Sequence, residues 1–72
     1  MEAARDKFAS NLRAYREDLG LSQEALADRC DLHRTEISLL ERGLRSPRLE
    51  TLVILARGLD LPSVGDLLHG VV

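Results

Sequence analysis

Three nearby side chains, those of Arg34, Thr35 and Ser38, are the groups in this sequence best placed to hydrogen-bond a partner. Arginine donates from a rigid planar fork, whereas the threonine and serine hydroxyls both donate and accept. Leu39 adds an apolar surface beside them. In a helix these four positions share a face, because residues four apart lie one turn above each other. The spacing therefore predicts a polar binding face on a helix.

Helices must hold that face in place, and apolar residues recur at helical intervals along the whole chain. Phe8, Leu12 and Tyr15 begin the pattern, and no segment shows the strict alternation of a strand. The sequence therefore predicts an all-α fold. We expect five short helices, over about residues 5–18, 23–29, 34–42, 49–59 and 63–69.

The second and third of these helices carry start signals. Ser22 is a strong N-cap residue for the second helix. His33 takes the same place before the third helix, with Glu36 three residues later at the spacing of a capping box. Two short helices joined by so few residues must cross steeply. They predict a helix-turn-helix motif over about residues 22–43.

The second helix of such a pair fits the major groove of DNA, where its first residues reach base edges. An arginine suits guanine, whose O6 and N7 accept two hydrogen bonds, and a leucine packs on the thymine methyl. We expect phosphate contacts from the second helix and from the arginines that follow the third. The predicted base-contacting residues are Arg34, Thr35, Ser38 and Leu39, and the predicted phosphate contacts include Gln23, Arg42, Arg45 and Arg48.

The charge distribution supports this expectation better than the total does. A net charge of −2 argues mildly against a nucleic-acid partner. Residues 29–48, however, hold five arginines against three carboxylates, whereas the rest of the chain holds five basic and nine acidic residues. Basic charge is therefore concentrated on and just after the predicted binding helix.

Three motifs give the chain a family resemblance. They are LR-x-x-R at residues 12–16, GLSQEALA at 20–27, and IS-x-x-ERG at 37–43, which is followed by Pro47. Joined at this spacing, they resemble the helix-turn-helix domain of the XRE family, shared by phage repressors, Cro and small bacterial regulators, including restriction–modification controller proteins. The resemblance covers about residues 8–68.

The resemblance implies a sequence-specific, DNA-binding transcriptional regulator. Gln23 matches a glutamine that binds phosphate and steadies the recognition helix. Arg16 and Glu41 match a buried ion pair that ties the first helix to the recognition helix. The backbone-contacting set that it implies is Ser22, Gln23, His33, Arg42, Arg45, Ser46 and Arg48.

The sequence departs from the family at two helix ends and at Glu36, which could read cytosine N4 but which we expect to serve as the capping partner of the third helix. Asp31 and Asp60 stand where the family usually has glycine. Aspartate tolerates the left-handed conformation better than most residues, so we expect both turns to form at some cost.

The C-terminal segment is unusually apolar for a short terminal helix. We expect Val64, Leu67, Leu68 and Val71 to form a homodimer interface. Such a dimer would place two recognition helices about 34 Å apart, matching a palindromic site in double-stranded DNA. In the alternative, Leu67 and Leu68 cap the core and the last residues fray.

Other classes of function find little support. The length allows a single domain over residues 1–72, and a lone cysteine without an apolar run of about 20 residues favours a cytoplasmic protein, not one in a membrane. Cys30 and His33 are too few for a metal site. The sequence offers no Ser/His/Asp grouping or phosphate-binding glycine loop, so we expect no enzyme, cofactor or small-molecule substrate.

One alternative function remains open. A helix-turn-helix scaffold can also serve as a protein–protein interaction module, and the acidic total and Glu36 on the binding face fit that hypothesis. The DNA-binding hypothesis requires that the arginine cluster, Arg34, Arg42, Arg45 and Arg48, contacts phosphate, whereas the protein-interaction hypothesis does not.

Overall fold

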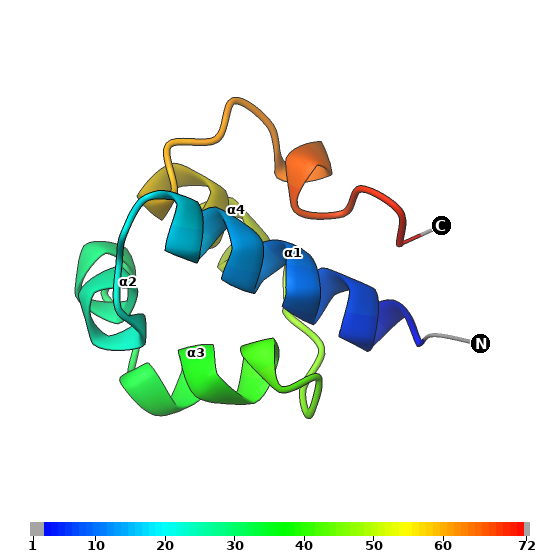
Figure 1. The fold of residues 1–72 in the computed structure, drawn as a ribbon, viewed down its shortest axis with the longest axis horizontal. Coiled ribbons are helices and arrows are strands. Elements are labelled where there is room, and N and C mark those ends of the chain that lie inside the picture. The colour runs from blue at the N-terminus through cyan, green and yellow to red at the C-terminus, as the bar shows by residue number, and fades with distance from the viewer. Residues whose placement is uncertain (1–2, 72) are drawn as a thin grey trace.

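Five helical segments follow one another in the computed structural model, which describes residues 3–71 (Figure 1). They are α1 (Ala4–Asp18), α2 (Gln23–Cys30), α3 (Arg34–Glu41), α4 (Leu49–Gly58) and a short 3₁₀ turn, η1 (Val64–Asp66). The described residues contain no strand, so the predicted all-α fold is confirmed. The four α-helices begin and end within one residue of the predicted bounds.

The predicted fifth α-helix is wrong in form. Only residues 64–66 are helical, as a 3₁₀ turn, and the chain continues through further turns to residue 71. Ser63 caps this turn, because its hydroxyl accepts a hydrogen bond from the Gly65 N–H at 3.0 Å. Glycine is a poor helix former, and a second one, Gly70, adopts a left-handed φ of +78°. Two glycines in so short a segment explain why no α-helix forms.

The turns between helices follow the chemistry of their residues. Gly20 ends α1 with φ +71°, and Ser22 then caps α2, its hydroxyl accepting from the Ala25 N–H at 3.0 Å. Asp31 and Asp60 adopt left-handed φ values of +54° and +56°, as expected from aspartate at glycine positions. The tight turn at Asp31 sets the steep crossing of α2 and α3.

The core lies where the four helices meet. α1 and α2 both pack against α3, and α4 packs against α2 and η1. In Figure 1, α3 lies along one edge of the molecule and the C-terminal segment along the opposite edge. The residues that form the buried cluster are Phe8, Leu12, Leu26, Ala27, Cys30, Ile37, Leu40, Leu52, Leu55, Ala56, Leu59 and Leu67.

None of the helices among residues 3–71 has the length and apolar character that crossing a membrane requires.

Candidate nucleic-acid interface

The inner face of α3 is fixed in the core. Ile37 and Leu40, one turn apart, are both fully buried. Burying two large aliphatic side chains contributes about 3–6 kcal/mol relative to leaving them in water. This packing holds α3 in one rotational setting about its own axis, so the opposite face is presented to solvent.

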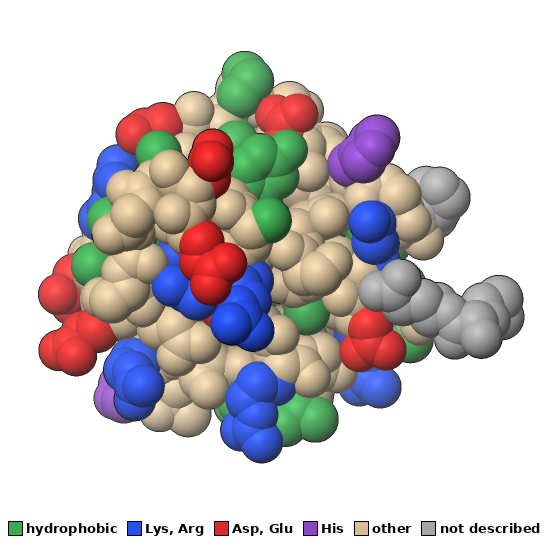
Figure 2. Space-filling view, in the orientation of Figure 1, with side chains coloured by type: hydrophobic (Ala, Val, Ile, Leu, Met, Phe, Trp, Pro, Cys, Tyr) green, Lys and Arg blue, Asp and Glu red, His purple; other side chains and the backbone are tan. Residues whose placement is uncertain are grey.

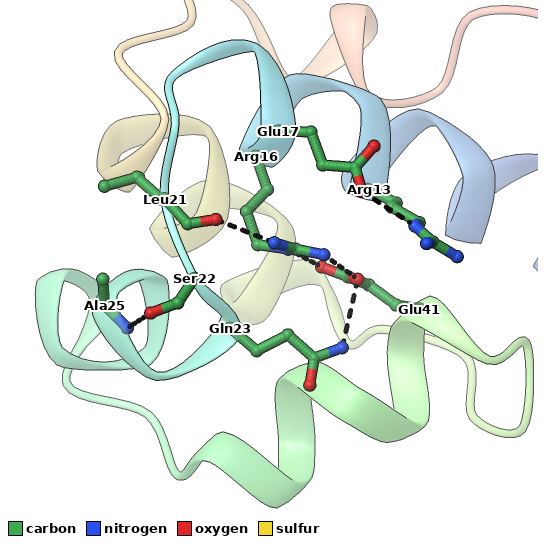
Figure 3. Close-up of polar contacts among 8 residues, drawn as sticks. All are labelled: Arg13, Arg16, Glu17, Leu21, Ser22, Gln23, Ala25 and Glu41. Carbon is green, nitrogen blue, oxygen red and sulfur yellow. Dashed lines mark hydrogen bonds and ion pairs between the residues drawn. The ribbon is translucent and has the colours of Figure 1, made fainter.

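A buried ion pair fixes the C-terminal end of α3 to α1 (Figure 3). The Arg16 Nε donates to Glu41 Oε2 at 2.6 Å, and Nη2 donates to Oε1 at 2.9 Å. A third bond runs from Arg16 Nη1 to the Leu21 carbonyl at 2.7 Å, in the loop before α2. The guanidinium therefore joins α1, α3 and the turn between α1 and α2, and Arg16 and Glu41 pair as predicted.

This pair is shielded from water. Only 3% of the Glu41 side chain is exposed. The hydrogen bond to Glu41 raises the pKa of Arg16 above its ordinary value; desolvation opposes that shift, and the charges of Glu41 and Glu17 add to it. A buried carboxylate needs a cation and further hydrogen bonds to offset its lost hydration, and Glu41 has both.

Gln23 supplies the additional bond and stands next to the outer surface. Its Nε2 donates to Glu41 Oε1 at 3.2 Å, from the first position of α2. A primary amide carries two N–H groups. One is used to hold Gln23 against α3, and the other is available for an acceptor such as a phosphate. Ser22, the other residue predicted here, uses its hydroxyl oxygen as the α2 cap.

The outward face of α3 carries the four residues predicted to contact bases. Arg34 and Thr35 are exposed, and Ser38 and Leu39 are partly exposed. They project from the side opposite Ile37 and Leu40, as the sequence spacing predicts.

The first turn of α3 differs from the prediction in one contact. The His33 Nδ1 caps the helix, accepting from the Thr35 N–H at 3.4 Å. The capping-box contact predicted for Glu36 is wrong. Its Oε1 instead accepts a hydrogen bond from Arg45 Nη1 at 2.6 Å. A charged guanidinium is a stronger donor than a backbone N–H, which explains why Glu36 bonds to Arg45 and not to the backbone at the start of α3.

Basic residues surround this face. Arg42, at the end of α3, and Arg48, directly before α4, are both exposed, as is Ser46 in the loop between them. In the space-filling view, Lys and Arg side chains recur along the edge where α3 and the following loop lie (Figure 2). Arg45 differs from the other two arginines, because its charge is already paired with Glu36.

The C-terminal segment packs on the core of its own chain, and the homodimer interface stays a prediction. Val64, Leu68 and Val71 are partly buried and pack against the core cluster from outside. Leu67 is fully buried within a single chain, so its assignment to a dimer interface is wrong. Asn11 explains its position, since its side-chain amide donates to the carbonyls of Leu67, at 2.9 Å, and His69, at 2.8 Å.

Two features have no counterpart in the sequence predictions. Leu49, on the apolar stripe of the fourth helix, is 71% exposed, and Leu44 in the preceding loop is also exposed. Leu49 is the first residue of α4, and the buried residues of this helix begin only at Leu52. Its position at the start of the helix could have indicated from sequence that it is exposed. The role of Asn11 has no sequence signal, because its partners lie more than fifty residues away.

No group of three or more His, Cys, Asp or Glu side chains within residues 3–71 is arranged to hold a metal ion.

Comparison with known proteins gives a consistent family. Residues 12–64 match the helix-turn-helix family HTH_3. The control protein C.SmaI of Serratia marcescens is 49% identical over 53 residues, which cover 74% of this chain and 63% of C.SmaI. The control protein C.BamHI of Bacillus amyloliquefaciens is 49% identical over 41 residues, 57% of this chain and 51% of its own. The matches thus span less than two thirds of either control protein.

Solved structures of controller proteins share the fold over nearly the whole chain. The restriction–modification controller protein C.AhdI of Aeromonas hydrophila is 38% identical with a TM-score of 0.84, covering 88% of this chain and 94% of its own. The controller protein C.Esp1396I, solved as a tetramer in complex with its natural 35 base-pair operator, is 27% identical with a TM-score of 0.85. That comparison covers 99% of this chain and 97% of C.Esp1396I.

Proposed function

Since the chain belongs to the HTH_3 helix-turn-helix family of transcription regulators, we propose that it binds a palindromic DNA operator as a homodimer, with α3 in the major groove. The observation that carries the proposal is the two-sided character of α3. One face is fixed by buried Ile37 and Leu40, and the other presents Arg34 and Thr35 to solvent. A rigidly held helix with free hydrogen-bonding groups suits base-edge recognition.

Each part of the interface has a separate role in this proposal. Arg34 donates to guanine O6 and N7, Thr35 and Ser38 bond to neighbouring base edges, and Leu39 packs on a thymine methyl. Phosphates are bound around this face, which fixes the register of α3 without reading sequence. The residues assigned to phosphate contact are Ser22, Gln23, His33, Arg42, Arg45, Ser46 and Arg48.

The ion pair between Arg16 and Glu41 serves this function at a distance. It contacts no base, but it fixes the orientation of α3 relative to α1. Gln23 donates a hydrogen bond to the same carboxylate. A phosphate bound by Gln23 would therefore be held in a fixed position relative to α3. The relative C.Esp1396I supports the proposal, because it has been solved on its operator.

The proposed homodimer forms through the C-terminal segment. Val64, Leu68 and Val71 pack on the outside of the core and supply its apolar part, with Leu67 now left out. These residues lie in η1 and the turns after it, apart from α3, so dimerisation through them leaves the outward face of α3 uncovered. A two-fold dimer would repeat the half-site at about 34 Å, one turn of DNA.

The test is selection from a randomised duplex library, followed by titration of the selected duplex. We expect an inverted repeat with half-site centres about ten base pairs apart. The Arg34→Ala variant should relax the preference at one base pair of each half-site, at a cost of about 1–3 kcal/mol. The matched control is Arg57→Ala, which removes an exposed arginine from the end of α4. Without enrichment, and without binding at low salt, the exposed face of α3 would instead serve a protein partner.

A further inference from the structure

Arg45 differs from the other arginines assigned to DNA contact in having an ion-pair partner within the described residues. Within residues 3–71, Arg34, Arg42 and Arg48 form no ion pair, whereas Arg45 Nη1 lies 2.6 Å from Glu36 Oε1. Glu36 belongs to the first turn of α3, and Arg45 to the loop nine residues later. The pair therefore links the proposed base-reading helix to the proposed phosphate-binding loop.

The two groups line an open cleft at this end of α3. His33, Ser46 and Arg48 also line it, as does a second carboxylate, that of Asp31, so Glu36 lies among groups assigned to phosphate contact. The Glu36 side chain is 26% exposed and that of Arg45 is 53% exposed. A carboxylate at this place is unfavourable for DNA binding unless it has a partner, because phosphates carry the same charge.

This ion pair is weak enough to exchange partners. Pairs exposed to this extent change a binding or folding equilibrium by only a few fold. Arg45 can therefore leave Glu36 for a phosphate, provided that the carboxylate it abandons finds another donor. In the major groove the donors are the exocyclic amines, cytosine N4 and adenine N6, whereas guanine and thymine offer acceptors that repel a carboxylate.

We propose that Glu36 determines sequence specificity by exchanging partners on DNA: it releases Arg45 to a phosphate and accepts a hydrogen bond from a base amine. At a site with that amine, Arg45 adds a phosphate contact. At other sites the two residues stay paired, and Arg45 contributes little. The pair thus suppresses non-specific binding and couples one phosphate contact to one base. This inference rests on the DNA-binding function proposed above.

The experiment compares Glu36→Ala with the wild type on the selected duplex and on a random-sequence duplex. The matched control is Glu24→Ala, which removes the glutamate from the first turn of α2. Like Glu36, it lies at the start of a short helix of the motif, but Glu24 forms no ion pair within residues 3–71. Circular dichroism and the melting temperature establish that each variant is folded.

We expect three results for Glu36→Ala. Affinity for random DNA rises, and the log–log salt slope on random DNA steepens by about one, the value for one more phosphate contact. On the selected duplex the slope stays that of the wild type, since Arg45 is already on phosphate there. The preference for cytosine or adenine at one position of each half-site, about tenfold, is lost. Glu24→Ala keeps that preference and the slope.

The Arg45→Ala background isolates the exchange from simple charge repulsion. In that background, Glu36→Ala should no longer steepen the slope on random DNA. An equal change of slope with and without Arg45, or an unchanged base preference in Glu36→Ala, would overturn the exchange while leaving the DNA-binding function intact. A wild type without salt-dependent binding to any duplex would overturn both.

Discussion

Replacing Arg16 with alanine should destabilise the fold strongly, because it leaves the Glu41 carboxylate buried without a cation. The substitution removes the donors at 2.6 and 2.9 Å and also the bond to the Leu21 carbonyl. Glu41 then keeps only the Gln23 amide, at 3.2 Å. Breaking one partner out of a buried pair costs about 3–5 kcal/mol.

That loss is large compared with the whole stability of the domain. Ordinary domains of this length unfold with about 4–11 kcal/mol. A loss of about 3–5 kcal/mol would lower the melting temperature by roughly 12–40 °C, since each kcal/mol shifts a domain of this size by about 4–8 °C. The assay is urea denaturation followed by circular dichroism at 222 nm, with the melting temperature measured in parallel.

Arg13→Ala is the matched control on the same helix. Arg13 also pairs with a glutamate, Glu17, at 3.2 Å, but both side chains are more than half exposed (Figure 3). An exposed pair of this spacing contributes only about 0.3–0.5 kcal/mol. If Arg16→Ala stayed within about 1 kcal/mol of Arg13→Ala, burial would not be what makes the Arg16–Glu41 pair essential to the fold, and the reasoning would be refuted.

Three further predictions concern other parts of the fold. Gly20→Ala and Gly43→Ala should each cost about 1–2 kcal/mol, because both sites have φ +71°, which strains alanine. The Asp6 carboxylate that a methyl group at Gly43 would meet belongs to an exposed side chain that can rotate away, so urea denaturation should give similar losses at the two sites. Burial raises the pKa of the Cys30 thiol, although the charge of Arg29 opposes the shift. As pH rises, the thiol therefore ionises in the unfolded chain before it does in the folded one, and the unfolding free energy should fall above about pH 8.5. The Cys30→Ala variant should lack that fall. Asn11→Ala should cost about 1–3 kcal/mol and speed amide exchange in the C-terminal turns, because it removes two hydrogen bonds to their carbonyls.

The helix-turn-helix could be predicted from sequence because its determinants are local. Ser22 and Gly20 lie within a few residues of the helix ends that they fix, and the positions of Ile37 and Leu40 follow from helical periodicity. Asp31 shows the same principle, since its tolerance of a left-handed φ is a property of the residue itself.

What the sequence could not show depends on contacts between distant residues. The apolar neighbours of Leu67 suggest a surface interface, and they give no sign that Asn11, on α1, holds the segment against the core. The capping-box spacing suggests a local partner for Glu36, but the return of the α3–α4 loop places Arg45 against it. Loop conformation decides that competition, and no local pattern encodes it.

The most direct test of the central claim is to remove single hydrogen-bonding groups from the grooves of the selected duplex, an acceptor from the major groove or a donor from the minor groove. In 7-deazaguanine a C–H replaces the major-groove N7 acceptor, whereas inosine lacks the minor-groove amine of guanine. We predict that 7-deazaguanine at one position of each half-site weakens wild-type binding about tenfold and leaves the affinity of the Arg34→Ala variant unchanged. Inosine at the same position should change the wild-type affinity little. Loss of binding with inosine but not with 7-deazaguanine would place the contact in the minor groove and contradict the docking of α3.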